Sequence, residues 1–116
     1  MVFQPIWTEE SEEIYNRLRA QAAAAQESRK KSGKKKATRA EGLFNQVRKC
    51  IDFLLENPRH PGLNTHEFRT RSNPYDEDAK VFEAYAQQNT PAAYRVFWCY
   101  GPEKGQITIL TITAHP

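Results

Sequence analysis

The spacing of apolar residues changes once along this chain, at Asn57-Pro58, and this change limits the possible folds more than any other feature. Before it, apolar residues recur every three or four positions, which is typical of helices; after it, apolar and polar residues alternate, which is typical of strands. Helical and strand segments are therefore grouped and do not alternate with each other. Such grouping predicts an α+β fold, with helices packed on one face of a sheet.

Three elements are predicted before the change. Residues 2–7 alternate and contain aromatic side chains, so they predict a short strand, in which Pro5 suits only an edge or an irregular position. Thr8 precedes an acidic first turn and predicts the start of a helix. The stretch "TRAE" places Thr38 three residues before Glu41, a capping box that predicts the start of a second helix. That helix ends at Asn57-Pro58.

Four strands are predicted after the change, at residues 65–71, 80–87, 93–100 and 106–114. Short connections favour antiparallel pairing. We therefore expect one domain over residues 1–116, with an N-terminal strand, a two-helix hairpin and then an antiparallel sheet of three to four strands.

Positive charge is concentrated between the two predicted helices, at about residues 28–39. This basic inter-helix loop contains seven Lys or Arg residues and no acidic residue, and because the whole chain carries +3, the remainder carries −4. A basic patch of this kind fits a phosphate-rich partner, and a solvated loop without function explains it equally well. The candidate RNA-binding residues here are Lys30, Lys31, Lys34, Lys35 and Lys36.

Several classes of function find no support in the sequence. No apolar run approaches the roughly 20 residues of a membrane span, and the first residues do not resemble a secretory signal, so we expect a cytoplasmic protein without a membrane partner. Cys50 and Cys99 lack CxxC spacing and are predicted to be buried thiols. Three histidines without metal-ligand spacing predict no metal site, and no motif indicates a cofactor.

Arg95 and His115 are the residues that best fit cleavage of a phosphodiester. Arginine offers a fork of donors that matches two phosphate oxygens, and histidine exchanges a proton near neutral pH. Each also has a simpler explanation: Arg95 solvates a sheet face, or His115 is merely exposed. Counting back from the turn "GPEKG" predicts Arg95 opposite Thr111, with His115 roughly 13 Å beyond, which favours a shared cleft over a hydrogen-bonded pair.

Three stretches resemble the RelE/ParE superfamily of bacterial type II toxins: "LLENPRHPGLNTHEF", "AYRVFWCYG" and "ITILTITAHP". The resemblance covers nearly the whole chain. It implies a β-α-α-β-β-β core and a cognate antitoxin as partner. It also implies one of two activities: RelE-like members cleave mRNA on the ribosome, and ParE-like members inhibit DNA gyrase. In some ribosome-dependent nucleases of the family, a catalytic histidine matches His115.

The resemblance extends to further residues. Some of these nucleases carry a carboxylate near His60, so either His60 replaces that base or the base is missing. His66 matches a histidine that more often braces a strand, and Arg69 and Arg71 either bind the RNA backbone or solvate a strand edge. We expect a ribosome-dependent mRNA endoribonuclease that needs no metal, whose basic loop contacts ribosomal RNA. The alternative is a gyrase inhibitor, or a non-catalytic member of the fold that acts by binding.

Overall fold

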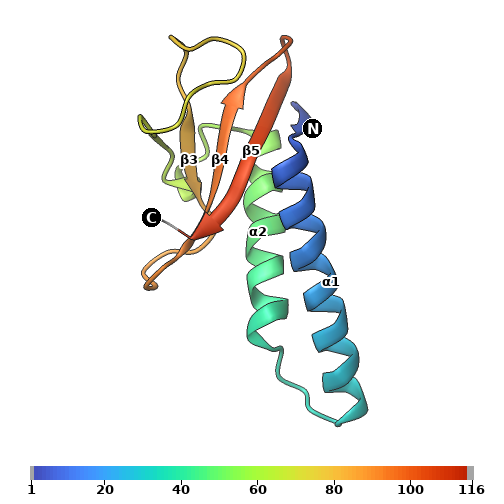
Figure 1. Ribbon diagram of the computed structural model, residues 1–116. Helices are drawn as coiled ribbons and strands as arrows, with labels where there is room; N and C mark the ends of the chain where they lie inside the picture. The colour runs from blue at the N-terminus through green and yellow to red at the C-terminus, as the bar shows by residue number, and fades with distance from the viewer. Residues whose placement is uncertain (1, 115–116) are drawn as a thin grey trace.

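The computed structural model describes residues 2–114, and it has the predicted α+β architecture (Figure 1). His115 lies outside the described residues. In chain order the elements are β1 (Gln4–Trp7), α1 (Glu9–Lys31), α2 (Arg39–Glu56), the short 3-10 helix η1 (Pro61–Leu63), β2 (His66–Glu67), β3 (Phe82–Tyr85), β4 (Tyr94–Tyr100) and β5 (Gln106–Ala114).

The five strands form one sheet in the order β1-β5-β4-β3-β2. Strands β2 to β5 pair antiparallel, which confirms the predicted arrangement. The predicted N-terminal strand, β1, joins the same sheet and pairs parallel to β5, a pairing that the sequence analysis did not predict. Because β1 is an edge strand, Pro5 lies where a residue without a backbone N–H is tolerated.

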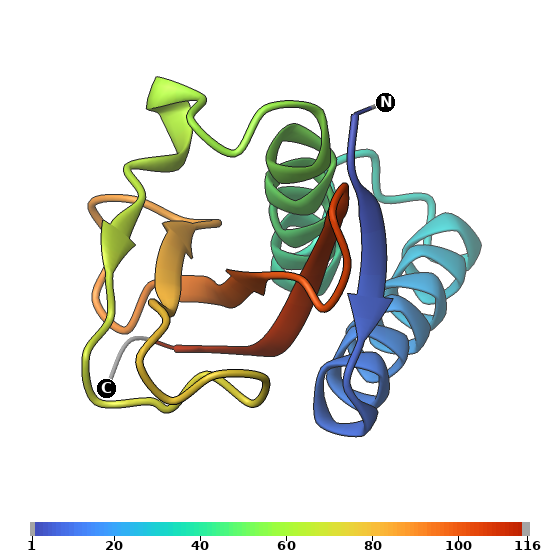
Figure 2. The ribbon, with the colours of Figure 1, turned by 90° about the horizontal axis from the view of Figure 1, so that it is seen from above.

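The two faces of the sheet bury different side chains. The main core, under the helices, contains Val96, Trp98, Ile109 and Ile112. Phe97 belongs to a smaller cluster on the opposite face. Both helices lie on one side of the sheet in the view from above (Figure 2). Successive side chains of β4 therefore alternate between the two faces.

The register between β4 and β5 differs from the predicted one. Arg95 pairs with Thr113 and not with Thr111, because the pairing starts one residue later at the turn and an irregularity follows between Phe97 and Trp98. Leu110 is the extra residue of this β-bulge, which shifts the alternation of β5 by one position. The bulge allows Ile109 and Ile112, three residues apart, to enter the same core.

Residues 68–81 form a loop over the sheet face opposite the helices (Figure 2). Phe68 packs edge-on against Phe97 with ring centroids 4.7 Å apart, and the Tyr75 hydroxyl lies 2.8 Å from Thr108 Oγ1. The strand predicted over residues 65–71 is wrong beyond Glu67, since Phe68 instead begins this loop.

The two helices form a hairpin that extends well past the end of the sheet (Figure 1). Both predicted N-caps are present: the Thr8 hydroxyl accepts from Ser11 N, and the Thr38 hydroxyl accepts from Glu41 N. Helix α1 continues to Lys31, so the first part of the predicted basic loop is helical, and the connection itself spans residues 32–38. No helix within residues 2–114 is long and apolar enough to cross a membrane.

Candidate functional site

Arg95, the second residue of β4, is held against the sheet face opposite the helices, and its side chain is only 10% exposed. Its Nη1 donates to the carbonyl oxygens of Gln87 at 3.2 Å and Ala93 at 3.1 Å. The guanidinium carbon lies 3.5 Å from the centre of the Tyr85 ring, a cation–π contact. Arg95 therefore places a positive charge at a fixed position on this face.

Three further side chains surround Arg95. Glu83 Oε2 lies 3.9 Å from Arg95 Nε, and Glu83 Oε1 lies 4.0 Å from His66 Nε2. His66 Nε2 is also 3.0 Å from the Tyr85 hydroxyl, and the imidazole tautomer determines which of the two groups donates. We call His66, Glu83, Tyr85 and Arg95 the sheet-face cluster. Strand register creates it, because Tyr85 pairs with Arg95 and His66 pairs with Glu83.

The four members of the sheet-face cluster differ in their access to solvent. The Glu83 side chain is 4% exposed, whereas that of His66 is 53% exposed. Arg95 Nε is buried and makes no hydrogen bond within residues 2–114. Histidine is the side chain suited to proton exchange near neutral pH, and a fixed guanidinium stabilises developing negative charge. The cluster thus combines an accessible imidazole, a carboxylate and a cation.

The structure does not bring His60 to Arg95. The His60 ring stacks on Phe53 of α2, with centroids 4.7 Å apart and an angle of 3° between the planes. Its Nδ1 accepts a hydrogen bond from Gly62 N at 3.0 Å, so the ring is fixed at the start of η1. His60 therefore packs on the helix side of the sheet, away from the sheet-face cluster.

Sequence reasoning missed Glu83 and Tyr85 as site residues and treated His66 as a structural brace. The alternation in "FEAY" does place Glu83 and Tyr85 on one strand face. Their approach to Arg95 depends on which strand is adjacent and in which register, which the sequence does not state. A carboxylate, that of Glu83, does lie next to Arg95, on the neighbouring strand β3.

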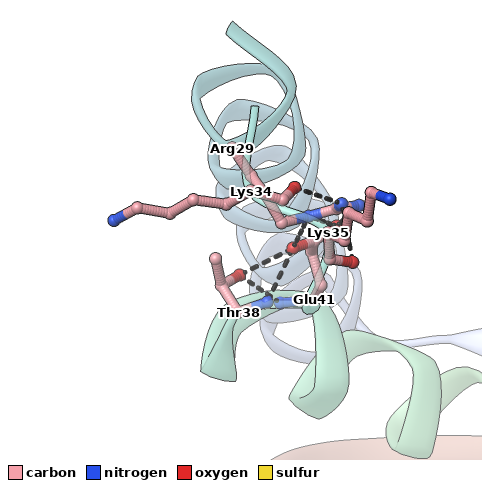
Figure 3. Close-up of polar contacts among 5 residues, drawn as sticks. All are labelled: Arg29, Lys34, Lys35, Thr38 and Glu41. Carbon is pink, nitrogen blue, oxygen red and sulfur yellow. Dashed lines mark hydrogen bonds and ion pairs between the residues drawn. The ribbon is translucent and has the colours of Figure 1, made fainter. Parts of the chain in front are cut away.

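The tip of the helical hairpin is closed by an ion pair between Arg29 and Glu41 (Figure 3). Arg29 Nη2 and Nε donate to the Glu41 carboxylate at 2.9 and 3.0 Å, and Arg29 Nη1 donates to the carbonyl oxygens of Lys34 and Lys35. Glu41 also accepts from the backbone N–H of Thr38 at 2.8 Å. The Arg29 guanidinium, followed by the Thr38 N–H, lowers the pKa of Glu41 to about 2. We call these contacts the hairpin clasp.

The hairpin clasp leaves the lysines of the tip exposed. The Lys34 side chain points away from the clasp (Figure 3), and Lys30, Lys31, Lys34, Lys35 and Lys36 are all exposed. Lys31 makes one exposed ion pair, at 3.4 Å to Glu27. The tip is therefore an ordered turn with several lysine side chains in solvent.

Arg69 and Arg71 do not form the predicted strand face, because both lie in the loop of residues 68–81. Arg69 Nε is 3.5 Å from Glu67 Oε2, and Arg71 Nη2 is 3.4 Å from Glu10 Oε2 at the start of α1. Each thus has an acidic neighbour, and neither joins the hairpin tip or the sheet-face cluster.

The cysteines are free and buried. Burial raises the pKa of Cys50 to about 12 and that of Cys99 to about 11, so both remain thiols at neutral pH. Within residues 2–114, no group of three or more His, Cys, Asp or Glu side chains is arranged to hold a metal ion.

Comparison with known proteins defines the class of fold. The chain has a RelE/ParE-type toxin fold: it is similar over 98% of its length to the whole of a solved YoeB/ParE toxin from Agrobacterium tumefaciens, with a TM-score of 0.59. Sequence identity to that toxin is 9%, so the likeness is one of structure. No family model matches the sequence, and no curated protein matches it.

Proposed function

We propose that this chain is the toxin component of a type II toxin–antitoxin system and that it cleaves mRNA on the ribosome as an endoribonuclease needing no metal. The sheet-face cluster carries the proposal, because it gathers a cation, a carboxylate and an accessible histidine on one sheet face. Cleavage of RNA without a metal requires groups of these kinds to move protons and to stabilise the crowded phosphate. The toxin fold supports the same reading and implies an antitoxin partner.

In this proposal each group has one role. Arg95 stabilises the charge that develops on the phosphate, and His66 exchanges a proton with the RNA, since it is the accessible member of the cluster. Glu83 holds both in position through its two oxygens. His115 follows the pairing partner of Arg95, Thr113, by two residues in the sequence, and we propose it as the second proton carrier.

The hairpin tip supplies affinity in this proposal. Its exposed lysines contact the phosphates of ribosomal RNA, while the hairpin clasp keeps the turn ordered. Since these contacts carry no base recognition, they position the protein and do not select the cleavage site.

The direct test is cleavage of a defined mRNA by the purified protein with purified ribosomes. We expect His66→Gln, His115→Gln and Arg95→Lys each to reduce cleavage by about 100-fold or more, because each removes a proton carrier or the guanidinium fork. Arg17→Lys, at an exposed position of α1, is the matched control for Arg95→Lys, and it should cleave at the parental rate. Undiminished cleavage by all three site variants would exclude this site, and an inactive parent protein would exclude the nuclease.

A second candidate function is inhibition of DNA gyrase by binding. One observation favours it: the Arg95 guanidinium already contacts two carbonyl oxygens, a carboxylate and an aromatic ring, which is what a purely structural arginine would do. Under this alternative the parent protein inhibits DNA supercoiling in a gyrase assay, and His66→Gln inhibits it equally well.

A further inference from the structure

A cavity of about 490 Å³ lies on the helix side of the sheet, away from the sheet-face cluster. It is bounded by the segment after α2, by η1, and by the aromatic side chains of β3 and β4. Phe82 and Trp98 stack there with ring centroids 4.7 Å apart, and Tyr100 completes the aromatic wall. The volume is within the range of sites that hold small organic ligands.

Two buried polar atoms at this cavity have no hydrogen-bond partner within residues 2–114. They are the indole Nε1 of Trp98 and the hydroxyl Oγ1 of Thr65, and both residues line the cavity. An unsatisfied buried donor is destabilising, so such atoms are uncommon unless something else supplies an acceptor. Indole N–H is a donor only, and a hydroxyl both donates and accepts. A ligand that reached the Trp98 indole N–H would satisfy it with an acceptor.

The rim of the cavity carries a positive charge and two exposed or partly exposed rings. Arg59 is an exposed cation that lines it, and the Tyr100 side chain is 46% exposed. His60, already fixed on Phe53, contributes a second ring at the rim. An aromatic wall, inner donors and an outer guanidinium suit a planar heterocycle with a carbonyl or ring nitrogen and an attached phosphate.

We propose that this cavity binds one nucleotide of single-stranded RNA, with the base against the aromatic wall and the phosphate at Arg59. This inference rests on the proposed function and names a substrate contact for it. Thr65 lines the cavity, and the next residue, His66, belongs to the sheet-face cluster. Thr65 immediately precedes β2 and His66 begins it, and β2 is one of the two edge strands of the sheet. An RNA strand that passes over this edge reaches both sites, so the cavity selects a base close to the cleaved phosphate.

The probes are GMP and AMP, with guanosine and adenosine for comparison, and binding is measured by calorimetry and by chemical shifts of the indole N–H. We expect at least one nucleotide to bind and to shift the Trp98 N–H signal. Arg59→Gln should weaken nucleotide binding about tenfold and leave nucleoside binding unchanged, because it removes the phosphate contact. Arg39→Gln, which removes an exposed arginine at the start of α2, is the matched control and should bind as the parent does.

Thr65→Val gives the sharper test, because it removes a hydroxyl without changing the shape of the side chain. Since that hydroxyl has no partner, the variant should be as stable as the parent protein or more stable, yet bind nucleotide more weakly. His66→Gln should abolish cleavage and leave GMP and AMP binding intact, so failure of the nuclease and failure of the cavity are distinguishable. The proposal would be overturned if neither nucleotide bound at millimolar concentration, or if Thr65→Val and Arg59→Gln both bound nucleotide as tightly as the parent protein does.

Discussion

Two arginine–glutamate pairs of the protein differ in distance and in surroundings. Arg29 and Glu41 meet at 2.9 Å at the hairpin tip, where they close a turn. Arg95 and Glu83 are 3.9 Å apart and nearly buried on a sheet face. The first pair is a short charge-assisted hydrogen bond, and the second is a looser pair within a larger cluster. Their loss should therefore be visible in different experiments.

The hairpin clasp predicts a pH dependence of stability. The pKa of Glu41 is lowered to about 2 in the folded protein, below the value of about 4.3 for an unfolded glutamate. Its stabilising contribution is therefore complete above the unfolded pKa and is lost as pH falls through the folded one. We expect the melting temperature of Glu41→Gln to fall less than that of the parent between pH 5 and pH 2. Glu103→Gln, at an exposed turn, should follow the parent curve.

The buried pair predicts non-additive effects on stability. Arg95→Ala removes the cation beside buried Glu83, and we expect a loss of about 3 kcal/mol in the free energy of unfolding. Adding Glu83→Gln should recover part of that loss, because the remaining side chain is then uncharged. Urea denaturation of both single variants and the double variant measures the coupling. Simple additivity would show that the two charges act independently.

At the scale of elements, Thr8 connects the start of α1 to the bulge of β5. Its hydroxyl accepts from Ser11 N at 3.0 Å and donates to the Leu110 carbonyl at 2.9 Å. Leu110 is the extra residue of the bulge, so the helix cap also satisfies a carbonyl in irregular backbone. The cap thus fixes the position of the helix on the sheet.

This double role predicts that removing the Thr8 cap costs more stability than removing the Thr38 cap. Thr8→Ala should cost about 2 kcal/mol, because it removes a cap and leaves the Leu110 carbonyl without that donor. Thr38→Ala should cost about 1 kcal/mol, since Arg29 continues to hold Glu41. Thermal or urea denaturation of each variant measures the difference, and Thr8→Ser should retain most of the stability. Equal costs at the two caps would mean that the contact with Leu110 contributes nothing.

The elements differ in how far the sequence predicts them. Both helices follow from their capping boxes and apolar spacing, and β5 was predicted over its full length, because these signals lie within each segment. The predicted Arg95–Thr111 pairing is wrong, because the bulge at Leu110 shifts the register. The bulge lets Ile112 pack in the core under the helices, which is a tertiary contact. Glu83 was missed as a site residue for the same reason: its position next to Arg95 depends on pairing between strands.

At the scale of the molecule, the hairpin separates positive charge from the sheet. The protein measures 52 × 26 × 23 Å, and the tip lies at one end of its length (Figure 1). Five of its eight lysines lie between residues 30 and 36, whereas the sheet-face cluster is on the strands. Contact with a large anionic partner at the tip therefore leaves the sheet face accessible.

This separation predicts a specific dependence on salt. Replacing Lys34, Lys35 and Lys36 with glutamine should weaken ribosome binding and reduce the slope of log affinity against log salt by about 2, because fewer counterions are released. Replacing Lys49, Lys80 and Lys104 removes the same charge elsewhere and is the matched control. Filter binding between 50 and 200 mM salt measures the slope for both triple variants. Over this range, a protein with several phosphate contacts loses about 10³-fold or more in affinity. Equal slopes for the two triple variants would show that the tip makes no phosphate contacts.

The parallel pairing of β1 with β5 has a consequence for the order of folding. Gln4 pairs with Gln106, so almost the whole chain separates two neighbouring residues of the sheet. During synthesis, β1 leaves the ribosome before β5 and stays unpaired until β5 has followed. The helical hairpin, in contrast, can form earlier from local contacts. Because β5 lies between β1 and β4, the sheet cannot close around an incomplete chain. The nascent chain therefore completes this sheet only after β5 has left the ribosome that makes it.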